Sequence, residues 1–154
     1  MSGPDGDRAL RKPLGVTAIG AAVLALGLSG LIGYVPVTTF VDVGLDRLET
    51  SAAGLFAGYA AAAALLLFGA LLTTARVVAG VHLLVLGAVL AAAAVGLEPA
   101  MVLHGEYRFY FQEIAELDGM DALSRAAGLV LGPLTLVLAL LPSTFRWVRQ
   151  RQAG

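Results

Sequence analysis

The sequence predicts an all-α integral membrane protein, built as a bundle of four transmembrane helices. Two observations lead to this prediction: four apolar runs of about 20 residues each, and a composition with 58% hydrophobic and only 14% charged residues. About 20 residues of helix cross a hydrocarbon core about 30 Å thick. In lipid a helix satisfies the backbone hydrogen-bonding groups of such a run within the run itself. The expected spans are residues 14–34, 51–72, 77–97 and 122–141.

The rest of the chain is too short for a soluble catalytic domain. Residues 1–13 are expected to be a disordered cytoplasmic tail, and residues 142–154 a basic cytoplasmic tail. Residues 35–50 and 98–121 form two outer loops. The first apolar run is longer than the ~7–15 residues of the apolar core (h-region) of a signal peptide, so we expect a retained helix. The chain has no cysteine, which excludes thiolate chemistry, and no motif assigns a cofactor, a metal site or nucleic-acid binding.

The charges predict the orientation. The segments at the two termini and the turn near residue 76 contain seven basic and two acidic residues, a net charge of +5. The two outer loops, with the first residues of the fourth span, contain three basic and nine acidic residues, a net charge of −6. By the positive-inside rule, both termini are cytoplasmic in a multi-pass protein of the plasma (inner) membrane. The heavy use of Ala, Gly, Val and Arg beside a single lysine, Lys12, suggests a prokaryote with a GC-rich genome.

Small residues recur at four-residue spacing within the spans. Such stripes let helix backbones approach closely, which favours helix association in lipid. Two alternatives are open: packing within the bundle, which we favour, and a face for a homodimer. The predicted packing residues are Ala21, Ala25, Ser29, Gly33, Gly54, Gly58, Gly128 and Gly132.

His82 is the candidate for a functional group inside the membrane. At helical rise it lies about 9 Å from the cytoplasmic surface, and Thr135 of the fourth span lies at a similar depth. Pro133 removes one backbone hydrogen bond of the fourth span and frees the carbonyl of Leu129. His82 with Thr135 therefore predicts either a ligand, haem or proton-relay site, or a structural role. In the structural role, which we favour, a neutral His82 bonds to Thr135, to Thr17 or to a backbone carbonyl and joins two helices. Tyr59 is expected to fill the core with a bonded hydroxyl.

The outer loops leave two structures open. β-Branched residues alternate in residues 35–43, and aromatic residues alternate in residues 106–114, a pattern that predicts pairing of the two segments as a short β-ribbon. The alternative is an interfacial aromatic belt followed by a surface helix over residues 113–125. In both cases the predicted outer interface consists of Tyr107, Phe109, Tyr110 and Phe111.

Four spans with a strand-bearing first outer loop are similar in outline to tetraspan proteins such as the claudins. The Trp-Gly-Leu-Trp signature and the cysteine pair of that family are missing, so no functional residue is transferred. The sequence leaves three functional hypotheses open. The favoured one is a non-enzymatic scaffold or accessory subunit that packs against a larger membrane protein. The alternatives are a small oligomeric transporter or channel, and a haem-binding or enzymatic subunit centred on His82.

Overall fold

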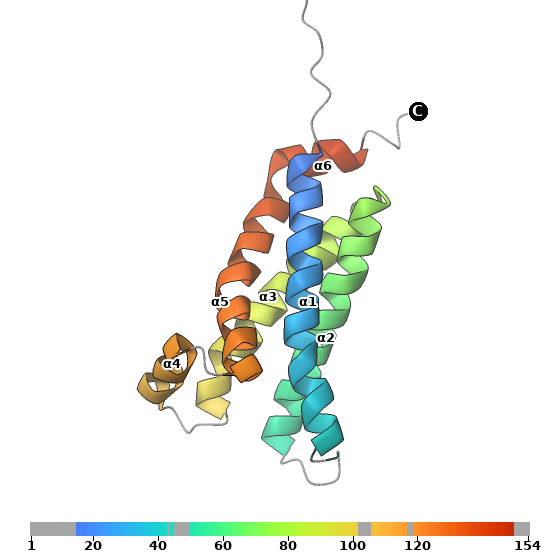
Figure 1. The fold of residues 1–154 in the computed structure, drawn as a ribbon. Helices are drawn as coiled ribbons and strands as arrows, with labels where there is room; N and C mark the ends of the chain where they lie inside the picture. The colour runs from blue at the N-terminus through green and yellow to red at the C-terminus, as the bar shows by residue number, and fades with distance from the viewer. Residues whose placement is uncertain (1–14, 43, 45–49, 102–105, 117–118, 150–154) are drawn as a thin grey trace, which may run out of the picture.

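The computed structural model of the protein describes residues 15–42, 44, 50–101, 106–116 and 119–149. Every regular element in these ranges is a helix (Figure 1). Four of the helices, α1, α2, α3 and α5, are long and apolar enough to cross a membrane, which confirms the predicted helical architecture with four spans. The helices are α1 (Val16–Asp42), α2 (Thr50–Thr74), α3 (Val78–Met101), α4 (Tyr107–Glu116), α5 (Gly119–Leu140) and α6 (Pro142–Arg149).

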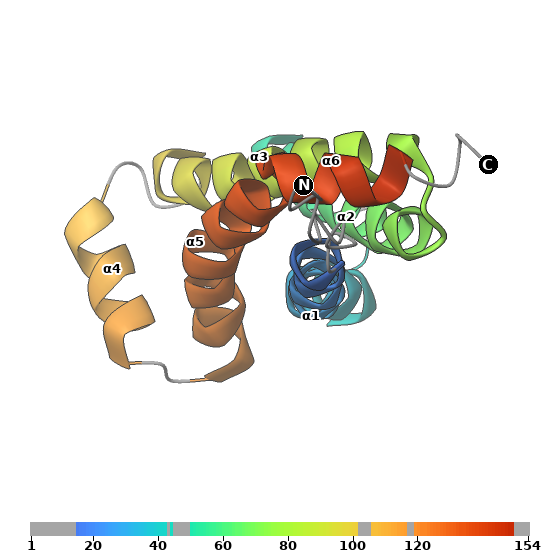
Figure 2. The same cartoon turned by 90° about the horizontal axis from the view of Figure 1, so that it is seen from above.

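The four spans form a ring of neighbours. α1 packs against α2 and α5, and α3 packs against the same two helices, whereas α1 and α3 touch only weakly across the bundle (Figures 1 and 2). The shared core is built from alanine and medium-sized aliphatic side chains, including Ala21, Ala62, Leu66, Leu84 and Val95. Small residues at the contacts bring the backbones close, so van der Waals packing can hold the helices together in lipid.

The α2–α3 hairpin is the tightest junction in the bundle. Arg76 closes the turn in the left-handed conformation, with φ of 61°. Gly80, in the first turn of α3, faces the last turn of α2. A Cβ atom there would lie 2.7 Å from both the carbonyl carbon of Leu72 and Oγ1 of Thr73. Gly80 therefore lets two backbones touch where any side chain would force them apart.

The predicted β-ribbon is wrong, because the described residues of both segments are helical apart from Glu106, and none of them forms a strand. α1 continues past the expected end of the first span to Asp42, and the aromatic segment forms α4. In the extension of α1, Oγ1 of Thr39 donates to the carbonyl of Val35 at 2.9 Å, and Oγ1 of Thr38 donates to the same carbonyl at 3.1 Å. A helix satisfies its backbone groups locally, whereas an isolated ribbon of two strands is only marginally stable.

α4 lies beside the bundle, next to the ends of α3 and α5 (Figures 1 and 2). Tyr110 and Ile114, one helical turn apart, are buried against the bundle. The other aromatic residues of the predicted outer interface, Tyr107, Phe109 and Phe111, are exposed. The predicted surface helix over residues 113–125 is wrong in its bounds, because the aromatic residues themselves lie in α4 (Tyr107–Glu116) and residues 119–125 belong to α5.

α6 lies across the opposite end of the bundle, over the ends of α1, α3 and α5 (Figure 2). Oγ of Ser143 is 3.0 Å from Oγ1 of Thr17 in α1, and Oγ1 of Thr144 donates to the carbonyl of Leu138 at 2.8 Å. The Trp147 ring packs directly on Gly15. The first part of the predicted basic tail is therefore a docked helix. We call this end of the bundle the α6 end and the other the α4 end.

Candidate functional site

A buried carboxylate at the α4 end gathers polar side chains from three other helices. Glu98, near the C-terminus of α3, is only 6% exposed. Tyr59 of α2, Tyr110 of α4 and Arg125 of α5 contact it directly, and Glu113 of α4 contacts Arg125. We call these five residues the Glu98 cluster. Because α3 and α5 run in opposite directions, the last turns of one lie beside the first turns of the other, which places Glu98 and Arg125 at the same level.

The two oxygens of Glu98 have separate sets of partners. Oε1 accepts hydrogen bonds from Nη2 of Arg125 at 2.7 Å and from Nε of Arg125 at 3.0 Å. Oε2 accepts one from the Tyr59 hydroxyl at 2.6 Å and lies 3.1 Å from the Tyr110 hydroxyl. The Tyr110 hydroxyl is also 3.0 Å from the carbonyl of Val95, so its single hydrogen is shared between these two acceptors.

Charge is balanced locally within the cluster. An unpaired buried carboxylate is costly, and the Arg125 guanidinium compensates it. Nη1 of Arg125 also reaches Oε1 of Glu113 at 3.3 Å, and the guanidinium lies 5.4 Å from the centre of the Tyr110 ring. Burial, followed by the neighbouring Glu98 carboxylate, raises the pKa of the Tyr110 hydroxyl above its usual value. Tyr110 is therefore a hydrogen-bond donor at neutral pH.

This geometry is that of a clamp between helices. A carboxylate offers about four acceptor positions. Arg125 and Tyr59 occupy three of those of Glu98, and Tyr110 shares its hydrogen between the fourth and the carbonyl of Val95. An incoming ligand would have to displace one of these donors. Among the described residues no group of three or more His, Asp or Glu side chains is placed to hold a metal ion.

The sequence did not reveal this cluster. The predicted second outer loop begins at Glu98, whereas in the structure Glu98 lies within α3 and faces the bundle. Tyr59 was expected to fill the core with a bonded hydroxyl, and it is buried with its hydroxyl on Glu98. The available signal was the pair of opposite charges, Glu98 and Arg125, at matching ends of two neighbouring antiparallel helices.

The structure places His82 and Thr135 in different surroundings. His82 is exposed on α3, where Nδ1 donates to the carbonyl of Val78 at 3.1 Å and the ring meets Phe145 edge-on. Thr135 is fully buried on α5, and its hydroxyl has no hydrogen-bond partner among the described residues. His82 therefore bonds to a backbone carbonyl, but to one of its own helix, and no hydrogen bond joins it to Thr135. A ligand role for His82 stays a prediction.

Six of the eight predicted packing residues lie at helix contacts. Ala21, Ala25 and Ser29 are buried on α1, and Oγ of Ser29 donates to the carbonyl of Ala63 on α2 at 2.8 Å. A Cβ atom at Gly33 would also contact Ala63, one at Gly128 would meet Val95 of α3 at 2.6 Å, and one at Gly132 would contact Ala88 and Ala92. Gly54 and Gly58 differ, because a Cβ atom added to either has no atom within 4 Å. The favoured interpretation, packing within the bundle, therefore does not fit these two glycines.

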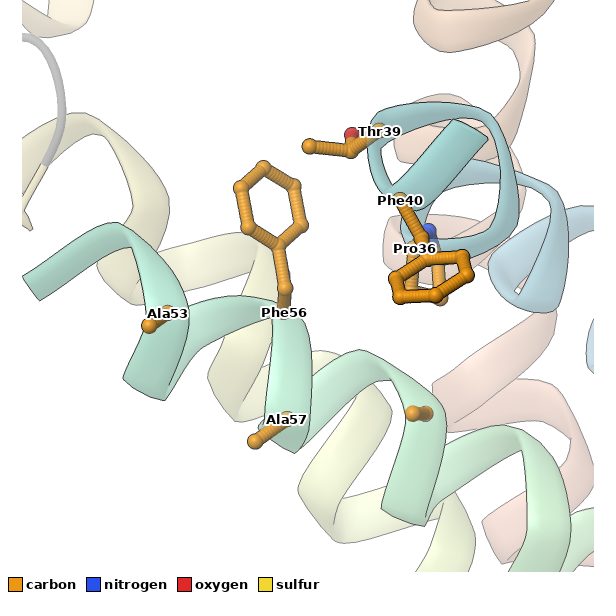
Figure 3. A pocket seen from close by; sticks show the side chains of 7 residues that line it. Pro36, Thr39, Phe40, Ala53, Phe56 and Ala57 are labelled. Carbon is orange, nitrogen blue, oxygen red and sulfur yellow. The ribbon is translucent and has the colours of Figure 1, made fainter. Parts of the chain in front are cut away.

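Two apolar grooves follow the outer surface of α2. The first separates α1 from α2 and has a volume of about 240 Å³; Phe56 of α2 stands on one side, with Pro36 and Phe40 of α1 on the other (Figure 3). The second separates α2 from α3, has a volume of about 170 Å³ and is lined by Gly54, Gly58, Leu90 and other apolar residues. Both are open to the surface on which lipid or another helix would lie.

The fold defines the class of protein: a multi-pass helical membrane protein with a polar clamp at one end. Four candidate transmembrane helices support this class. Comparison of the chain with models of protein families, with curated proteins and with solved structures finds no match.

Proposed function

We propose that this protein is a non-enzymatic accessory subunit that packs the α4-side half of α2 against a transmembrane helix of a larger membrane protein. The observation that supports this function is a continuous surface of small residues on α2 that the bundle itself does not cover. The saturated Glu98 cluster supports the non-enzymatic part, since its polar groups already bind one another.

The surface lies on one face of α2. Its members recur at intervals of three or four residues, the spacing of a single helix face. All are exposed except Gly58, which is half-buried and still has open space around its Cα. We call this surface the α2 small-residue face; it consists of Gly54, Ala57, Gly58, Ala61 and Ala64.

The other half of α2 provides an internal comparison. There the exposed side chains are large, namely Leu67, Phe68 and Leu71. Large exposed side chains also cover α5, for example Val130 and Val137. These fit a surface in contact with lipid chains. A row of glycine and alanine instead lets a second backbone approach closely, which is how helices associate in membranes.

The grooves beside this face suit a helical partner. One lies between α2 and α1, and the other between α2 and α3. A partner helix laid on Ala57 and Gly58 can insert its larger side chains into both grooves. The contact would then combine close backbone approach with apolar side-chain packing.

Replacing Gly58 by leucine is expected to abolish the complex while leaving the bundle folded. The added side chain would point into space that is open in the isolated protein and is filled by the partner in the complex. Gly27 of α1 provides the matched control, because it is an exposed helical glycine that also has no atom within 4 Å of an added Cβ. The measurement is mild-detergent copurification of the full-length chain from native membranes, with thermal stability recorded on the same samples.

The wild type and Gly27→Leu should bring down a larger partner in constant ratio, and Gly58→Leu should not. A Gly58→Leu variant that keeps the partner would show that the α2 small-residue face is not the docking surface. A wild type that copurifies only with itself would contradict the accessory role.

A small oligomeric transporter or channel is the second candidate function. It is favoured by one observation, the buried ionisable pair Glu98 and Arg125, because ionisable groups within membrane bundles often serve ion or proton movement. Self-association of the wild type, together with ion flux in vesicles that Glu98→Gln abolishes, would support this alternative over the accessory role.

The proposed orientation places the α6 end in the cytoplasm and the α4 end outside, in a plasma or inner membrane. It rests on the net charges of +5 and −6 in the corresponding segments. A reporter fused after Gly154 should be active only in the form that works in the cytoplasm, and a tag inserted at Gly119 should be accessible from outside intact cells. The reverse pattern at both sites would overturn the orientation.

A further inference from the structure

We infer that the α6 end is a binding surface for the headgroups of anionic phospholipids, with Arg146 and Arg149 as the main contacts. This surface is separate from the α2 small-residue face, and its occupant differs in chemistry. The inference rests on the docking of α6, on the position of the arginines and on the distribution of acidic residues.

α6 is fixed to the bundle by one face. Thr144, Trp147 and Val148 are buried, and hydroxyl contacts join Ser143 and Thr144 to Thr17 of α1. The helix therefore lies across the ends of the spans, as Figures 1 and 2 show. An amphipathic helix at this level, where the apolar spans end, lies at the height of the lipid headgroups.

The opposite face of α6 presents positive charge. Arg146 and Arg149 are exposed, whereas Trp147 and Val148, which lie between them in the sequence, face the bundle. Arg76 of the α2–α3 turn joins them at the same end, with its guanidinium 4.6 Å from the centre of the Trp147 ring. Arginine suits this role because its planar guanidinium can bind a phosphate through two parallel hydrogen bonds.

No described carboxylate neutralises these arginines. The acidic residues that the structure describes all lie at or near the α4 end. They are Asp42, Glu98, Glu106, Glu113, Glu116 and Asp121. The two ion pairs among the described residues both involve Arg125. An anion at the α6 end is therefore attracted by several positive charges without a described competing acid, and the lipid headgroup is the anion that membrane insertion supplies there.

The test uses the full-length protein in nanodiscs of an equimolar mixture of phosphatidylglycerol and phosphatidylcholine. After mild extraction, native mass spectrometry measures which lipid stays bound. The wild type should retain phosphatidylglycerol in preference, and Arg146→Gln/Arg149→Gln should lower that preference by about fivefold per arginine. Arg108→Gln, which removes an exposed arginine of α4 instead, should keep it.

Equal retention of the two lipids by the wild type would overturn the inference, as would an unchanged preference in the double variant with its fold intact by circular dichroism. Inorganic phosphate provides a further discrimination. If inorganic phosphate, added at the concentration of phosphatidylglycerol in the sample, displaces the bound lipid completely, the surface is a general anion site. The assignment to a lipid headgroup is then wrong. Failure of phosphate to displace it would support the assignment.

Discussion

Glu98→Ala is expected to destabilise the bundle by about 3 kcal/mol, the lower end of the range for breaking a buried ion pair. The loss leaves the Arg125 guanidinium with only the longer contact to Glu113 and leaves two tyrosine hydroxyls without their carboxylate. The value lies at the lower end because the Arg125 side chain is 20% exposed and can turn toward solvent or headgroups. The measurement is unfolding of the purified protein in mixed micelles as the fraction of denaturing detergent rises.

The double variant Glu98→Leu/Arg125→Leu provides the control. It removes both charges together, so no unpaired ion stays buried, and apolar replacement of a whole buried pair is often neutral or stabilising. We expect the double variant to be more stable than either Glu98→Ala or Arg125→Ala. If instead the double variant loses as much free energy of unfolding as the two single variants together, the two residues do not interact. The clamp is then not formed in the membrane.

Gly80→Ala is expected to destabilise the protein by about 1–3 kcal/mol or more, as overpacking of a tight contact does. The new methyl group would meet the backbone of Leu72 and Thr73, which cannot move aside as a flexible side chain can. Gly96 on the same helix provides a matched control, because it is exposed and has no atom within 4 Å of an added Cβ. Since alanine is the better helix former by about 1 kcal/mol, Gly96→Ala should be neutral or stabilising.

The two glycine variants therefore test the α2–α3 contact by the sign of the change in stability, which should fall for Gly80→Ala and not for Gly96→Ala. Thermal unfolding of both proteins in the same detergent gives the comparison. Equal shifts in the same direction would mean that the close approach of α2 and α3 is absent in solution.

The spans could be predicted from sequence because lipid imposes one local rule. An apolar run of sufficient length must be helical in lipid, whatever its neighbours are. The ends of the spans are not set by that rule. α1 continues to Asp42 through Pro36, with the Thr38 and Thr39 hydroxyls bonded back to the helix, although the same threonines contributed to the strand-like pattern. β-Branched residues in such a segment fit either structure.

α4 shows the same ambiguity of period. Tyr107, Phe109 and Phe111 alternate as in a strand, yet Tyr110 and Ile114 recur with helical spacing and are the residues that the bundle buries. A short segment can satisfy both periods, and tertiary contacts then decide. For the Glu98 cluster no local pattern exists at all. Its members are spread from Tyr59 to Arg125 and come together only when the helices are packed.

The Glu98 cluster also bears on how the chain enters the membrane. α5 is the least apolar of the four spans, with a mean hydropathy of 1.8 against 2.0 to 2.4 for the others. Its first turns contain Ser124, whose hydroxyl donates to the carbonyl of Leu31, and Arg125, which pairs with Glu98. Both partners belong to spans that precede α5 in the chain, Leu31 to α1 and Glu98 to α3. The contacts of Ser124 and Arg125 with earlier spans therefore compensate the lower hydropathy of the last span.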